Sequence, residues 1–181
     1  MKKYLQNSTV ALLCAVVIVL GSTLGNLNRN LSTKVQAVEE LWTGKYGIVE
    51  KLEERCSSAS QLWSVLHEVS ALEEECAEVR SAYNALYDLD LDMAQAASLY
   101  TANERLSAAS ASLLSAAREE CPESRNLELA ESYYSDMVNA QRVLEQSSYH
   151  EALSELNDLF SAPHIALLRP FLRVTLPEEF A

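Results

Sequence analysis

One stretch, residues 62–86, carries the most regular pattern of hydrophobic positions in the chain. Its apolar residues recur alternately three and four positions apart, which places them along one side of an α-helix. They are Leu62, Val65, Val69, Leu72, Cys76, Val79, Tyr83 and Leu86. Burying a large apolar side chain contributes about 1.5–3 kcal/mol, so we expect this helix to pack against partner helices.

Similar spacing predicts a helix before this stretch, and polar clusters predict where helices end. The apolar side of the earlier helix is formed by Leu31, Val35, Val38, Trp42, Val49 and Leu52. Gly44 and Gly47 interrupt it, since glycine costs about 1 kcal/mol relative to alanine inside a helix. A turn is predicted at residues 56–58, and the helix over residues 62–86 is expected to fade at residues 88–92, where three aspartates alternate with leucines.

Two further helices are predicted in the second half of the chain. One carries Met93, Ala96, Tyr100, Leu106, Leu113 and Leu114. It is either a separate helix or the continuation of the helix over residues 62–86. Pro122 breaks it, because proline cannot continue a helix interior. The last helix then runs over residues 124–160 and ends at Pro163.

The N-terminal segment has the composition of a membrane anchor. Lys2 and Lys3 precede residues 4–28, which carry no ionisable side chain other than tyrosine and cysteine. A helix over residues 5–25 would rise by about 30 Å, the thickness of the hydrocarbon core of a bilayer. The two lysines favour a cytoplasmic N-terminus. The alternative is a cleaved signal peptide, with small residues at positions 21–25 but no Ala-x-Ala site.

These elements predict an all-α protein. We expect an antiparallel up-and-down bundle of three to four long helices with an N-terminal transmembrane helix. The predicted divisions are a cytoplasmic stub and anchor over residues 1–25, the bundle over residues 26–162, and an apolar tail containing prolines over residues 163–181.

Composition supports helices and argues against nucleic-acid binding. Hydrophobic residues make up 49% of the chain, and no glycine follows Gly47, which disfavours hairpins and phosphate-binding loops. The net charge of −12 would repel a phosphate backbone. The acidic side chains are interpreted as a solvated surface, and a dedicated cation site is the alternative.

Motifs that carry chemistry are missing from the sequence. The residues three positions before His67, His150 and His164 are serines, so the Glu-x-x-His pairs of di-iron bundles are absent. The aspartates of residues 88–92 lack the central glycine and closing glutamate of a calcium loop. No Cys-x-x-Cys, His-Glu-x-x-His or Gly-x-Ser-x-Gly is present. The sequence therefore predicts a protein that is not an enzyme and that has no cofactor or metal.

Two cysteines are candidates for a disulfide bond. In an up-and-down bundle, a helix ending at Cys56 and a helix ending at Cys121 would finish at the same end, outside the cytoplasm. A bond between them would add about 4 kcal/mol in the chain-entropy model. Two free thiols near turns are the alternative.

The tail contains basic residues in an otherwise acidic chain. Because the last helix returns towards the membrane, Arg169 and Arg173 are predicted to approach lipid headgroups. The alternative is that the tail folds onto the first and last helices.

The segment from Tyr149 to Asn157, Tyr-His-Glu-Ala-Leu-Ser-Glu-Leu-Asn, resembles the Tyr-Asn-Glu-Ala-Val-x-x-Tyr-Asn motif of the LemA family of bacterial membrane proteins. The positions that carry the resemblance are Tyr149, Glu151, Ala152, Asn157, Pro163 and Phe171. His150 and Leu156 depart from the motif, as expected for a divergent member. The resemblance implies a helical bundle held outside the cytoplasm by one helix in the bacterial inner membrane, and no established catalytic activity.

We therefore predict a non-enzymatic, membrane-anchored scaffold or protein-interaction module, with an unknown protein partner that contacts exposed residues such as Tyr87 or Leu66. The alternative is an extracytoplasmic module that binds or senses a small ligand or a cation. A pocket with converging polar groups would favour the alternative, and an apolar surface patch would favour the scaffold.

Overall fold

The computed structural model describes residues 2–121, 125–172, 174 and 176–180, and for residues 2–9, 164 and 166 it describes the backbone alone. About 85% of the chain is helical, and the described residues contain no β-strand. The predicted Arg173 contact and the break at Pro122 lie outside the described residues. The chain forms two compact units: residues 1–38 with 152–176, and residues 39–151 with 177–181.

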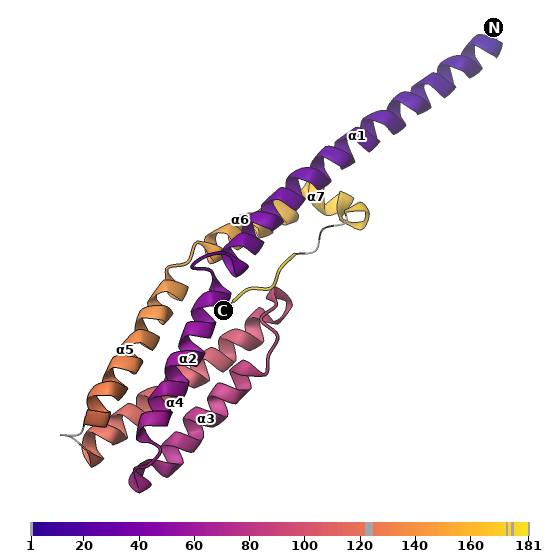
Figure 1. The fold of residues 1–181 in the computed structure, drawn as a ribbon. Coiled ribbons are helices and arrows are strands. Elements are labelled where there is room, and N and C mark those ends of the chain that lie inside the picture. Colours follow the sequence, from indigo (N-terminus) through magenta and orange to yellow (C-terminus); the bar gives the residue numbers. More distant parts are fainter. Residues whose placement is uncertain (1, 122–124, 173, 175, 181) are drawn as a thin grey trace. The chain divides into compact units, whose positions relative to one another are not determined.

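The second unit contains the helical bundle. Its long helices are α2 (Ile48–Leu66), α3 (Glu73–Tyr87), α4 (Ala96–Glu120) and α5 (Arg125–Glu145). Successive helices run in opposite directions, and α2 packs against α3, α4 and α5 (Figure 1). The short 3₁₀ helices η1 (Ser70–Leu72) and η2 (Met93–Gln95) precede α3 and α4. The predicted all-α, antiparallel bundle is confirmed.

The first unit contains most of α1 (Lys2–Thr43), most of α6 (Tyr149–Ser161), α7 (Pro163–Leu168) and the 3₁₀ helix η3 (Arg169–Phe171). The most apolar 18-residue window of the N-terminal helix has a mean hydropathy of 2.3 and no buried residue, so it is long and apolar enough to cross a membrane. A signal sequence near an N-terminus meets the same criterion. Further along α1, Leu31 and Val38 are buried, and Lys34 pairs with Glu155 of α6.

The glycine interruption predicted after Trp42 is confirmed. Helix α1 ends at Thr43 and α2 begins at Ile48, with Gly47 as its N-cap. A Cβ atom on Gly47 would lie 2.7 Å from the carbonyl oxygen of Trp42 and 2.8 Å from that of Gly44. The turn therefore needs a residue without a side chain at this position.

The prediction of one helix over residues 62–86 is wrong. Helix α2 ends at Leu66, and extended backbone at Val69 separates it from η1 and α3. The apolar spacing does not reveal the turn, because Val65 and Val69 continue it although they are only half-buried, whereas Leu66, which lies outside the spacing, is buried. Three glutamates open α3, where negative charge is favoured by the helix dipole.

Two other boundaries also differ from those predicted. The predicted turn at residues 56–58 lies inside α2, and the predicted helix over residues 124–160 is divided between α5 and α6. The α5–α6 break has a local cause, since the Tyr149 amide donates to the hydroxyl of Ser147, a side-chain bond that competes with helix. The break at residues 88–92 is confirmed, and Asp92 accepts a hydrogen bond from the Ala94 amide.

Candidate functional site

An open groove lies between α2 and α3 and is lined by aromatic, aliphatic and polar side chains. We call it the aromatic groove, and it has a volume of about 520 Å³. Its lining residues are Leu52, Glu53, Cys56, Ser57, Ser60, Gln61, Tyr83, Leu86, Tyr87, Leu89 and Leu91. This volume lies within the usual range of binding pockets, about 300–1,000 Å³.

The aromatic groove combines an apolar base with an exposed aromatic pair. Leu52 and Leu86 are fully buried beneath it. Tyr83 and Tyr87 stack with their ring centroids 5.4 Å apart, and Tyr87 is 66% exposed. The prediction named Tyr87 and Leu66 as exposed contacts; Tyr87 is exposed, but Leu66 is buried in the core, so that part is wrong.

The Cys56 thiol in the aromatic groove has low nucleophilic reactivity. Burial raises the pKa of Cys56 to about 11, and the charge of Arg55 opposes this only in part. A thiol with this pKa is almost wholly protonated at neutral pH, whereas nucleophilic cysteines need a lowered pKa. The groove can therefore bind a ligand, but Cys56 is not poised to attack one.

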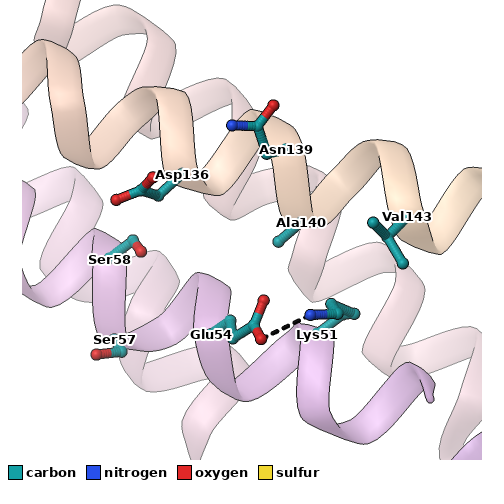
Figure 2. A pocket seen from close by; sticks show the side chains of 8 residues that line it. All are labelled: Lys51, Glu54, Ser57, Ser58, Asp136, Asn139, Ala140 and Val143. Atoms are coloured by element: carbon teal, nitrogen blue, oxygen red, sulfur yellow. Dashed lines mark hydrogen bonds and ion pairs between the residues drawn. The ribbon is translucent and has the colours of Figure 1, made fainter. Parts of the chain in front are cut away.

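A second groove lies on the other flank of α2, against α5. We call it the polar groove, and it has a volume of about 390 Å³. Its lining residues are Lys51, Glu54, Ser57, Ser58, Asp136, Asn139, Ala140 and Val143. Lys51 donates to Glu54 at 2.6 Å, and Figure 2 shows Asp136 extending from α5 towards Ser58 on α2.

The buried guanidinium of Arg55, on α2, connects this helix to α4 and α5 through hydrogen bonds. Arg55 is only 2% exposed, and its guanidinium donates to Asn103 Oδ1 at 2.6 Å, Ser107 Oγ at 2.5 Å and the Met137 carbonyl at 2.7 Å. Asn103 in turn donates to Gln141 at 3.0 Å. Burial lowers the pKa of Arg55, and the charge of Glu104 partly offsets that effect. All the hydrogen-bond acceptors are neutral, so the network holds the charge through hydrogen bonds and not through an ion pair.

These buried polar residues were missed by sequence analysis. The spacing of apolar residues does not include them, although Arg55 lies three positions after Leu52 and four before Ala59, which are both buried. Asn103 fills the corresponding gap between Leu99 and Leu106 of α4. The sequence signal for a buried polar side chain was therefore its position, which completes an apolar stripe.

The predicted disulfide rests on a wrong premise. Cys56 lies inside α2 and not at a helix end, whereas Cys121 is the C-cap of α4. Both thiols are free in the structure, and the Cys121 thiol donates to the Ala117 carbonyl at 3.1 Å.

Close to the C-terminus, Phe180 packs into an aromatic cluster with residues of the bundle. Phe180 is buried and lies edge-on to the rings of Trp42 and Tyr100 at 5.8 and 5.5 Å. The Tyr149 hydroxyl donates to the Glu178 carbonyl at 2.7 Å, and its ring lies 5.3 Å from that of Trp42. Burial raises the pKa of Tyr149 to about 12. Tyr149 therefore holds Glu178 against the bundle.

The other residues singled out by the resemblance have varied environments. Glu151 and Pro163 are exposed, Ala152 and Asn157 are half-buried, and Phe171 is 70% exposed. Arg169 is exposed in η3. These residues therefore do not share the packing role of Tyr149.

The described residues include no group of three or more histidine, cysteine, aspartate or glutamate side chains that could hold a metal ion. The chain matches no protein-family model, and no curated protein or solved structure shows significant similarity to it.

Proposed function

We propose that this chain is a membrane-anchored helical bundle that binds a segment of a partner protein in the aromatic groove and has no enzymatic activity. The observation that carries the proposal is the stacked Tyr83–Tyr87 pair, with Tyr87 two-thirds exposed above buried leucines. Tyrosines are enriched where proteins bind one another, since they offer a large contact area and a hydroxyl for hydrogen bonding.

The polar rim of the aromatic groove is better suited to binding a peptide or a helix than to binding a flat apolar surface of a partner. Glu53, Ser57 and Gln61 on α2 supply hydrogen-bonding groups beside the leucines. An apolar centre with a polar rim is the usual composition of such interfaces. An amphipathic helix could place apolar side chains between the two tyrosines and α2.

Crosslinking from the groove tests this proposal in native membranes. A photoreactive phenylalanine would replace Tyr87 in the full chain, and a matched chain would carry it at Tyr46, which is 62% exposed outside the groove. We expect a discrete protein adduct from position 87 alone. Gln61→Trp, which fills the groove, should suppress that adduct, whereas Gln146→Trp on the exposed α5–α6 turn should not. An adduct that is unaffected by Gln61→Trp would refute binding in the groove.

We also propose that the chain is a LemA-like protein of the bacterial inner membrane, with its N-terminus in the cytoplasm and its bundle outside. The support is the motif around Tyr149 and the lysines before the apolar segment. A cysteine replacing exposed Glu104, in a chain without its native cysteines, would report the side of the membrane. Labelling by an impermeant reagent added from outside is expected, and labelling only after lysis would refute this orientation.

The polar groove supports a second candidate function, the binding of a small polar ligand or a cation. Polar side chains from α2 and α5 converge there, with Asp136 opposite Ser58 (Figure 2). If calcium binds there, it should raise the melting temperature of the full chain, and Asp136→Asn should remove that increase. Asp158→Asn, at an exposed position on α6, is the matched control. Equal responses of the two variants would exclude the site.

A further inference from the structure

The segment formed by α7 and η3 exposes large apolar side chains in an unusual way. Leu167 is 79% exposed and Phe171 is 70% exposed, and the exposed Arg169 lies between them in the sequence. Ile165, in the same short helix, is only 3% exposed. Among the side chains that the structure describes in this segment, Ile165 is buried, whereas Leu167 and Phe171 are exposed to solvent.

Within its compact unit, this segment lies beside α1. The ion pair between Lys34 and Glu155, at 3.9 Å, shows that Glu155 of α6 lies at the level of Lys34 of α1. From there α6 and α7 continue along α1 towards its N-terminal half (Figure 1). Pro163, which opens α7, is eight positions beyond Glu155, a rise of about 12 Å if the path is helical. That rise brings α7 to the level of about residue 26 of α1.

This level coincides with the end of the uncharged segment. Arg29 is the first residue after Lys3 that carries a full charge at neutral pH. A helix crossing a bilayer places such a boundary at the headgroups. Leu167 and Phe171 would then meet the acyl boundary, and Arg169 would meet the headgroup phosphates.

We propose that α7 and η3 form a membrane foot, which inserts Leu167 and Phe171 into the lipid interface on the side of the membrane opposite the N-terminus and places Arg169 against anionic headgroups. The proposal rests on the membrane anchoring proposed above. A bilayer is the occupant that the geometry favours, because α1 itself brings lipid to this level. Apolar side chains and a basic residue on a short amphipathic element are the features of interfacial segments.

Depth-dependent quenching in the full chain tests the membrane foot. The chain without its four native cysteines would carry a single cysteine at position 167 or 171, labelled with an environment-sensitive fluorophore. Val17→Cys marks the centre of the anchor, and Val138→Cys on α5 marks an exposed apolar position on the bundle. Circular dichroism confirms that each variant is helical. Vesicles contain lipids with a nitroxide quencher near the headgroup or at mid-chain.

We expect the headgroup quencher to be the more effective at positions 167 and 171, the mid-chain quencher at position 17, and neither at position 138. Quenching at position 17 with none at positions 167 and 171 would overturn the membrane foot and leave the anchor intact. Absence of quenching at position 17 would overturn the anchor, and the membrane foot with it.

The role of Arg169 is tested by changing lipid charge. Quenching at position 171 should increase when neutral vesicles are replaced by vesicles containing phosphatidylserine. Arg169→Gln should reduce that increase by about fivefold, the effect of one basic residue near such a surface. Arg142→Gln, at an exposed position on α5, should not change it. Equal behaviour of the two variants would overturn the headgroup contact.

Discussion

Replacing Arg55 with lysine tests whether the buried guanidinium holds the bundle together. The guanidinium uses three nitrogen atoms, Nε, Nη1 and Nη2, to reach acceptors on α4 and α5 at 2.5–2.7 Å. A lysine keeps the charge but offers donors from a single nitrogen atom. It cannot reach acceptors spaced to match a planar fork, so at least two of the three hydrogen bonds are lost.

The magnitude follows from those two bonds. A hydrogen bond to a charged group contributes about 1.5–3 kcal/mol, and the acceptors left behind are buried. We therefore expect Arg55→Lys to lower the free energy of unfolding by about 3–6 kcal/mol. This is a large share of the roughly 5–15 kcal/mol that stabilises an ordinary domain. The remaining ammonium would also be buried, at a position where the wild-type side chain is 2% exposed.

Urea denaturation of the full chain in detergent micelles, followed by circular dichroism, measures the loss. Arg105→Lys is the matched control, because Arg105 is exposed and its bond to Ser81, at 3.2 Å, lies on the surface. That variant should change the free energy of unfolding by less than about 0.5 kcal/mol. If Arg55→Lys also cost less than about 1 kcal/mol, the three hydrogen bonds would not be a main support of the fold.

Three further predictions concern other parts of the bundle. The hydroxyl of Ser110 is buried without a hydrogen-bond partner among the described residues. Ser110→Ala should therefore raise the free energy of unfolding by about 1 kcal/mol in the same urea assay. A lower free energy of unfolding would refute this reasoning. Gly47→Ala should lower the free energy of unfolding by about 2 kcal/mol or more, because its Cβ would press on backbone oxygens. Gly25→Ala, with open space around it, is the control and should be neutral or slightly stabilising. Equal melting temperatures of the two variants would contradict the tight turn. Since burial raises the pKa of Cys56 and Cys76 to about 11, their alkylation near pH 8 should be about 100-fold slower in the folded than in the unfolded chain. Between about pH 9 and pH 11 the folded chain keeps protons that the unfolded chain loses, so stability should fall as pH rises through this range, and less so in a chain with alanine at both positions; a flat profile would refute the shifts.

The fold class was predictable because apolar spacing reports which side of a helix is buried, whichever helix it belongs to. For the same reason the spacing could not place the turn after Leu66. Val65 and Val69 continue the spacing of three and four through the turn although they are only half-buried, whereas the core contains Leu66, which lies outside that spacing. The three glutamates that open α3 were a local sign of a new helix start.

The candidate sites were harder to predict, because they depend on which helices become neighbours. Tyr83 and Tyr87 share a helix, and their proximity follows from their spacing. The α2 wall of the aromatic groove, including Gln61, follows only from the packing of α2 on α3. Likewise, nothing in the local sequence around Phe180 indicates that it would meet Trp42 and Tyr100.

Helix α2 connects the stability of the bundle to both grooves. Its buried side packs on α4 and α5 through Arg55. One flank of α2 lines the aromatic groove and the other lines the polar groove, and Ser57 lines both. A rotation of α2 that relieved the buried charge would therefore widen one groove and narrow the other. Because the acceptors of Arg55 lie on two different helices, the network resists that rotation in either direction. A polar residue in the core is thus well placed to fix the shape of the binding surface as well as the register of the helices.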